Sequence, residues 1–191
     1  MYTYNFYWSI IQIAIGLYAI KLMGGFEEFR KSIKFKEMRE NSPKSILLII
    51  GLVAFSQAMI WISILLIAIT TYGGIEAYLE GWRLVVRELP LWSIIYMVAI
   101  APFTAGIFEE AIWRWFGIEH LEEHYPTRKA NTIQALTFGI WHGLSFHAVV
   151  TAIIGFVYGE VYIRKRRLAE LIIAHIITDI IGFGLAFLVL V

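Results

Sequence analysis

The chain has 191 residues, of which 59% are hydrophobic and 16% charged, and its formal net charge is +1. Soluble domains average about 25% charged residues, so this composition excludes an ordinary soluble protein and is typical of a membrane protein. The small net charge argues against a nucleic-acid partner, and the absence of cysteine excludes disulfides and thiolate chemistry.

Six segments are apolar over roughly the 20 residues that a membrane-spanning helix needs. In chain order they cover residues 4–23, 45–71, 89–117, 130–146, 147–163 and 168–191. No basic leader precedes the first segment, so we expect a retained membrane helix rather than a cleaved signal peptide. Pro102 should kink the third segment, and Gly143 with Ser145 offers the turn between the fourth and the fifth.

The loops between these segments predict an orientation. Loops 24–44, 118–129 and 164–167 fall on one side of a six-span arrangement and hold most of the basic residues. Lys and Arg favour cytoplasmic loops, so this side is predicted to be the cytoplasm of a cell-membrane protein, with both termini outside. Residues 72–88 mix apolar and charged residues, which predicts an interfacial helix. We therefore expect an all-α polytopic transmembrane helix bundle of about six spans, forming a single membrane domain over residues 1–191.

Ionisable residues occur inside these apolar spans, where a charged side chain costs about 2.5–3.5 kcal/mol on insertion scales. The third, fourth and sixth spans contribute them, and they are Glu109, Glu110, Arg114, His142, His175 and Asp179. At about 1.5 Å per residue, Glu109, His142 and His175 lie roughly 11–18 Å below the predicted cytoplasmic end of their helices. We therefore expect one layer of ionisable groups that opens toward the cytoplasmic side.

Spacing predicts partners within this layer. Glu110 and Arg114 lie four residues apart on one helix with the acid first, which favours an internal ion pair. His175 and Asp179 are also four apart, so the carboxylate can hold the imidazole in one tautomer. Glu109 is rotated by about 100° from Glu110 and can face a different partner.

Two chemistries fit one free carboxylate with two imidazoles. The set can activate a water molecule as a general base and stabilise a developing oxyanion. Glu109, His142 and His175 are also ligand types that zinc takes, so a metal centre is an alternative. Acid and histidine chains build proton relays as well, which makes a proton- or ion-coupled carrier a further alternative. The sequence has no internal repeat of the kind that many carriers have, which argues against it.

Three short motifs resemble those of the CAAX protease and bacteriocin-processing (CPBP, or Abi) family, which includes the type II CAAX prenyl endopeptidases. Residues 109–114 (EEAIWR) resemble its EExxxR motif, residues 138–142 (FGIWH) its FxxxH motif, and residues 175–179 (HIITD) its HxxxN/D motif. Each motif alone is weak, but three in this order within apolar segments are specific. The family-like core covers about residues 89–191, and the first 88 residues are not matched.

The resemblance implies an intramembrane endopeptidase that cleaves a membrane-associated peptide or protein, with lipidation of that substrate left open. It implies that Glu109 and His142 activate the attacking water, while Glu110 and His175 complete the site and Asp179 supports it. Arg114 is then the structural counter-ion of Glu110. We favour a glutamate mechanism without a cofactor, with zinc as the alternative. A non-catalytic membrane scaffold or immunity protein is a further alternative, against which the intact motifs argue.

The other histidines are expected to lie outside the site. His147 is predicted to be interfacial, near the far end of its helix and at the wrong depth, while His120 and His124 should be solvated in a charged loop. Trp113, Trp115 and Trp141 flank the motifs, where helix or lipid packing is expected rather than a substrate groove.

Overall fold

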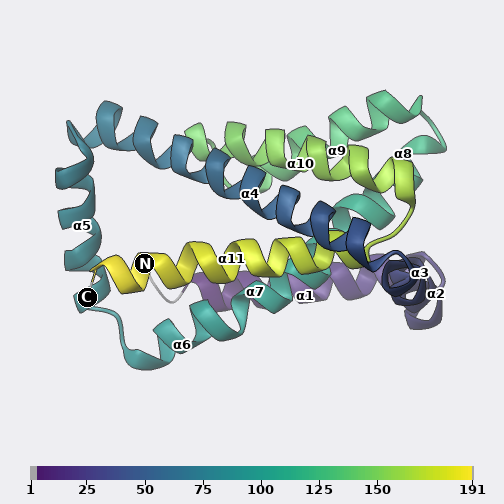
Figure 1. Cartoon of the computed structure of the whole chain (residues 1–191), viewed down its shortest axis with the longest axis horizontal. Coiled ribbons are helices and arrows are strands. Elements are labelled where there is room, and N and C mark those ends of the chain that lie inside the picture. The colour runs from purple at the N-terminus through teal and green to yellow at the C-terminus, as the bar shows by residue number, and fades with distance from the viewer. Residues whose placement is uncertain (1–3, 191) are drawn as a thin grey trace.

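Helices account for nearly all of the computed structural model, which describes residues 4–190 and the side chains of residues 6–184. Two of the helical segments, η1 and η2, are π-helical, and Figure 1 shows how the helices are arranged. In chain order the elements are α1 (Tyr4–Leu22), α2 (Phe26–Ile33), α3 (Phe35–Glu40), α4 (Ser42–Ile67), η1 (Ala68–Tyr72), α5 (Ile75–Arg87), α6 (Leu91–Ala99), α7 (Ala101–Glu109), η2 (Glu110–Ile118), α8 (Glu119–Glu122), α9 (Thr127–Trp141), α10 (Phe146–Lys165) and α11 (Ala169–Leu190). The predicted all-α membrane helix bundle is confirmed.

Three helical runs in the described part of the chain are long and apolar enough to cross a membrane, namely Ser42–Tyr72, Leu91–Glu122 and Phe146–Lys165. A fourth results if the pair Phe6–Leu22 and Phe26–Glu40, bent by 94°, counts as one span. The fourth predicted span is shorter than expected, because α9 has only 15 residues. The number of six spans therefore stays a prediction.

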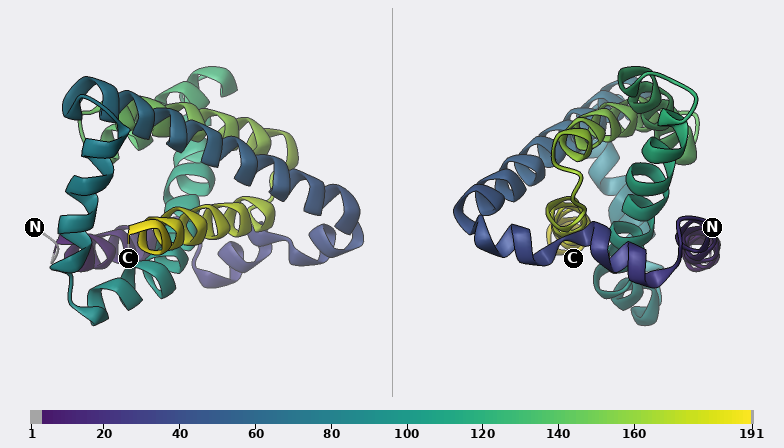
Figure 2. Two further views of the ribbon diagram at one scale, coloured as in Figure 1. Left: turned by 60° about the vertical axis from the view of Figure 1, so that its left-hand side comes forward. Right: turned by 90° about the vertical axis from the view of Figure 1, so that its right-hand side faces the viewer.

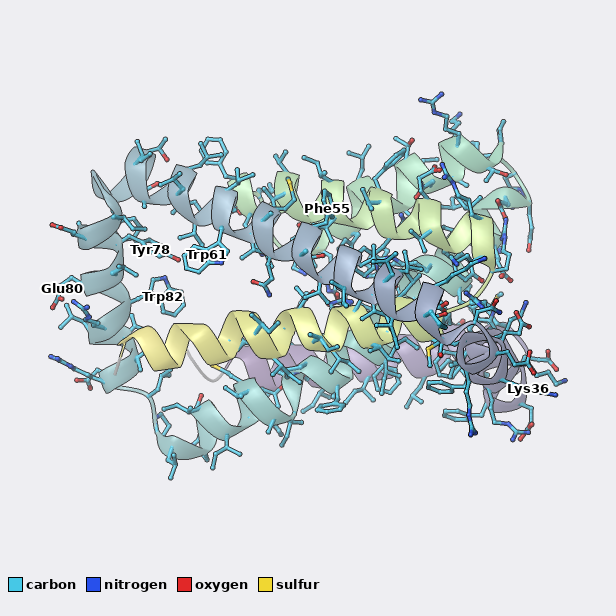
Figure 3. All side chains as sticks on the ribbon, viewed as in Figure 1. Lys36, Phe55, Trp61, Tyr78, Glu80 and Trp82 are labelled. Carbon is cyan, nitrogen blue, oxygen red and sulfur yellow. The ribbon has the colours of Figure 1, made fainter. Side chains whose placement is uncertain are left out.

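Different elements lie at the two ends of the bundle. Figure 1 shows α2, α3 and α8 gathered at one end, while α5 lies at the opposite end near the start of α1 and the end of α11. In Figure 3, Tyr78 and Trp82 on α5 project toward Trp61 of α4, whereas Glu80 points away from the bundle. Lys36 projects outward at the other end. Residues 72–88 thus contain a helix, α5, as predicted; its place at a membrane interface stays a prediction.

The stretch 24–44 was expected to be a polar loop and instead contains α2 and α3. Gly24 and Gly25 have φ values of 99° and 92°, which turn the chain sharply after α1. On α2, Phe29 is buried while exposed ion pairs three residues apart join Glu27 with Arg30 and Glu28 with Lys31. The charged residues therefore form the outer face of an amphipathic helix, which a count of charges alone does not reveal.

The third predicted span is interrupted close to Pro102. Helix α6 ends at Ala99, Ile100 departs from regular helix geometry with φ −119° and ψ −52°, and Pro102 lies in the first turn of α7. Proline is tolerated there because the first turn does not need its missing N–H group. The helix is therefore interrupted where the kink was predicted.

Helix α11 lies near the centre of the bundle and α1 at its edge (Figure 2, right). α11 packs against α4 and α7. A Cβ atom on Gly106 would lie 2.5 Å from Ile176 Cγ1 and 3.2 Å from the carbonyl oxygen of Ile172, so only glycine allows this approach of α7 to α11. Small residues have the same role in other membrane helix pairs. The contact brings the last turn of α7 against the middle of α11.

Candidate active site

Two adjacent buried acids lie where α7 passes into η2. Glu109 is the last residue of α7 and Glu110 the first of η2, and both are almost inaccessible to solvent. The π-helical geometry of η2 was not predicted, because nothing in its sequence separates it from an ordinary helix. π-Helical segments are rare and are frequent at functional sites.

His175, on α11, is the centre of the buried cluster. Its Nδ1 donates a hydrogen bond to Glu110 Oε1 at 2.7 Å. Its Nε2 lies 3.7 Å from Glu109 Oε2 and 3.8 Å from Asp179 Oδ2. The predicted proximity of His175 and Asp179 is confirmed, and α7, η2 and α11 together surround one imidazole with three carboxylates.

Arg114 supplies the fixed positive charge of the cluster. Its Nη1 lies 3.2 Å from Glu110 Oε1, and both side chains are fully buried, so the predicted ion pair is confirmed. The guanidinium also lies over the ring of Phe138 at 4.4 Å and over that of Tyr158 at 5.3 Å. Such cation–π contacts replace part of the hydration that a buried guanidinium loses.

Gln12 of α1 joins this site, and sequence reasoning missed it. Its side-chain amide is buried and donates a hydrogen bond to Glu109 Oε1. The other oxygen of Glu109, Oε2, is buried and accepts no hydrogen bond from any described residue. The available signal was a glutamine inside an otherwise apolar segment, since a buried amide needs a partner. Gln57 was missed in the same way and donates to the carbonyl oxygen of Thr178 at 2.7 Å.

His142 lies at the C-terminal end of α9 rather than within a longer span. Its Nδ1 donates to the carbonyl oxygen of Phe138 at 2.9 Å, and its ring meets the Phe138 ring edge-on at 4.7 Å. Among the described residues no hydrogen bond or ion pair joins His142 to Glu109 or His175 directly. Phe138 contacts both His142 and Arg114, so a chain of direct contacts connects His142 with the His175 cluster.

The prediction that His147 lies at the wrong depth for the site is corrected. Its ring centroid is 5.9 Å from that of His142. The cause is the short α9, which ends at Trp141, so that α10 starts beside His142. Gly143 makes this turn possible with a φ of 94°.

Several aromatic side chains pack against one another beside His142. Trp141 contacts Trp8 at 4.5 Å and Trp113 at 5.7 Å between ring centroids, so the predicted packing role of these indoles is present. The indole N–H groups of Trp113 and Trp141 are buried without an acceptor among the described residues. Buried donors of this kind are uncommon in proteins.

The zinc alternative is not supported by the arrangement. Glu109, His142 and His175 do not bring three ligand atoms within 4.8 Å of one another. The one such group among the described residues is His120, Glu123 and His124, and it is exposed. As described, the buried cluster brings together acid, base and hydrogen-bonding groups, and the ligand atoms of Glu109, His142 and His175 do not converge on one point.

Comparison with known proteins supports the assignment made from the motifs. Residues 90–181 match the family model described as type II CAAX prenyl endopeptidase Rce1-like. This range contains all three motifs and both histidines of the predicted site, whereas Gln12 lies outside it. No curated protein and no solved structure matches the chain.

Proposed function

We propose that this chain, which belongs over residues 90–181 to the Rce1-like type II CAAX prenyl endopeptidase family, is an intramembrane endopeptidase. In the proposed mechanism, Glu109 and His142 activate the water molecule that attacks the peptide bond. The observation that carries the proposal is the buried cluster in which His175 contacts three carboxylates within apolar helices. Ionisable groups at this depth are costly and usually functional. The proposed substrate is a peptide bond of a membrane-associated peptide or protein.

Glu109 is the proposed general base. Gln12 holds one carboxylate oxygen, and the other is buried and accepts no hydrogen bond from the described protein. That oxygen can accept the proton of the attacking water as the water oxygen bonds to the scissile carbonyl carbon. The same proton then passes to the leaving amine as the C–N bond breaks, which returns Glu109 to its starting state.

The tautomer of His142 supports its part in this step. A carbonyl oxygen only accepts hydrogen bonds, so Nδ1 carries the proton that bonds Phe138. In the neutral imidazole Nε2 then has a free lone pair, and no described residue engages it. His142 can therefore orient the water with Nε2 while Glu109 takes its proton.

His175 and Asp179 are proposed to stabilise the oxyanion. The Nε2 edge of His175 faces Glu109 and Asp179 beyond hydrogen-bond distance, so it can still engage a ligand atom. The imidazolium form of His175, in which both ring nitrogens carry a proton, would donate from Nε2 and stabilise negative charge that develops on the carbonyl oxygen. Asp179 orients His175, and the Glu110–Arg114 ion pair fixes its other edge. We place the opening of the site on the cytoplasmic side, where the basic residues predict the cytoplasm to be.

The test is cleavage of candidate membrane peptides, with and without a C-terminal prenyl group, by the purified chain in liposomes. Glu109→Gln and His142→Ala are expected to abolish cleavage, whereas Glu80→Gln, an exposed change on α5, should cleave like wild type. A chelator should leave the rate unchanged. If both site variants fold and cleave as fast as wild type, the protease proposal is wrong. Ion flux that the same two changes abolish, without any cleavage, would replace it with the carrier alternative.

Gln12→Leu is expected to lower kcat by roughly tenfold with little change in KM. The reason is that Gln12 contacts Glu109 and would act on the base rather than on the substrate; losing one hydrogen bond to a charged group is worth about 1.5–3 kcal/mol. Steady-state cleavage kinetics measure the effect. Tyr18→Phe, an exposed change on the same helix, is the control and should match wild type. Equal kcat for Gln12→Leu and wild type would show that Glu109 does not depend on α1.

A further inference from the structure

A cluster of histidine and carboxylate side chains lies outside the buried site, where the chain leaves η2. We infer that His120, Glu123 and His124 form a binding site for a divalent transition metal of the zinc class. Their three ligand atoms lie within 4.8 Å of one another, and all three residues are exposed. Figure 1 places α8, which contains His120, at the end of the bundle away from α5.

The backbone puts the three side chains on one face. The N–H of Glu123 bonds to the carbonyl of His120, and the N–H of His124 to that of Leu121, so the helical turn continues beyond α8. Residues three and four apart on such a turn are neighbours. His120 Nδ1 is 3.5 Å from Glu123 Oε1, and the two imidazole centroids are 5.8 Å apart.

These separations suit a metal after small side-chain rotations. Zinc binds histidine nitrogen and carboxylate oxygen at about 2.0–2.2 Å, which sets neighbouring tetrahedral ligands roughly 3.3 Å apart. The His120–Glu123 pair already has nearly this separation. His120 also stacks on Phe116, with 5.4 Å between centroids and 11° between planes, which restrains one ligand in advance.

The surroundings leave Glu123 as the available carboxylate. Glu119 accepts a hydrogen bond from Tyr162, and Glu122 binds Arg166 through both oxygens at 2.7 and 2.8 Å. Two imidazoles and one carboxylate form a ligand set that suits zinc and leaves a further position for water. Magnesium and calcium prefer sites built from oxygen alone. The site therefore favours zinc over the hard divalent ions.

Occupation of this site would fix the turn that connects two parts of the fold. η2 carries Glu110 and Arg114 on one side of α8, and α9 follows on the other. A metal that bridges the turn between them would hold the end of η2 against fraying. Because a ligand that binds the folded state alone stabilises it, zinc should raise the melting temperature of the wild-type chain.

Zinc titration of the detergent-purified chain, without a polyhistidine tag, tests this inference by calorimetry and by melting temperature. Wild type is expected to bind one zinc ion per chain. His120→Ala and His124→Ala should each lose this binding together with the zinc-induced rise in melting temperature. Glu123→Gln should weaken binding at least tenfold, because even the loss of a group that only supports a ligand costs about 10–100-fold in affinity.

Glu109→Gln and His142→Ala serve as controls that keep the exposed cluster intact, and both should bind zinc like wild type. Circular dichroism of His120→Ala and His124→Ala checks that these exposed changes leave the fold intact. Unchanged zinc binding in the His120→Ala/His124→Ala double variant would overturn the inference. So would binding that is lost in Glu109→Gln instead, because the metal would then occupy the buried site. Neither result depends on whether the chain cleaves peptides.

Discussion

His175→Ala is expected to lower the cleavage rate by about 10²–10³-fold, the usual effect of removing one oxyanion donor. It should also destabilise the fold, because Glu109, Glu110 and Asp179 would lose the imidazole that lies 2.7–3.8 Å from each of them. Rates in liposomes and melting temperature in detergent measure the two effects. Removing this one side chain should therefore impair both catalysis and stability.

His175→Gln separates the two effects. Its amide can still donate a hydrogen bond to Glu110, so the melting temperature should recover toward wild type while the rate stays low. The exposed change His124→Ala is the matched control, and it should alter neither quantity in the absence of zinc. A fully active His175→Ala variant would show that His175 has no part in the proposed mechanism. A variant that is inactive but as stable as wild type would show that His175 does not stabilise the fold.

Arg114→Met is expected to lower the free energy of unfolding by about 3–5 kcal/mol, the range for breaking a buried ion pair by removal of one partner. The change leaves Glu110 fully buried without its guanidinium and removes the two aromatic contacts that Arg114 makes. Arg83→Met is the matched control, because the Arg83–Glu80 pair is exposed, and exposed pairs are worth about 0–1 kcal/mol. Detergent-unfolding curves of the two variants measure the difference.

Adding Glu110→Gln to Arg114→Met identifies the cause of the lost stability. In the double variant Arg114→Met/Glu110→Gln both charges are absent, so most of the lost stability should return. If Arg114→Met is no less stable than Arg83→Met, the buried ion pair does not hold η2 in place. If the double variant is as unstable as Arg114→Met, the loss comes from packing against Phe138 and Tyr158 instead.

Contacts set by spacing within one helix could be predicted from the sequence. Glu110 with Arg114, and His175 with Asp179, lie four residues apart, and a helix brings such pairs together whatever surrounds it. That Glu110 and His175 belong to one site followed from the order of the three motifs, whereas the direct hydrogen bond between them was not predicted. These features depend on periodicity and hydrophobicity, which the sequence carries directly.

Contacts between distant helices could not be predicted. Gln12 reaches Glu109 only because α1 packs against α7, and no local pattern specifies that contact. The place of His147 depended on where α9 ends, and helix ends are poorly marked in an apolar sequence. The stretch 24–44 was expected to be a loop because its charges were counted without following their periodicity around a helix.

The hydrogen bond from Gln12 to Glu109 has a consequence for how the chain can be divided. The segment that matches the family model begins at residue 90. Gln12, which holds the carboxylate of Glu109, comes from α1, near the start of the chain. The family-matched segment is therefore shorter than the part of the chain that forms the candidate site. If the proposed function holds, a transfer of this site to another scaffold would have to include α1 or supply an equivalent amide.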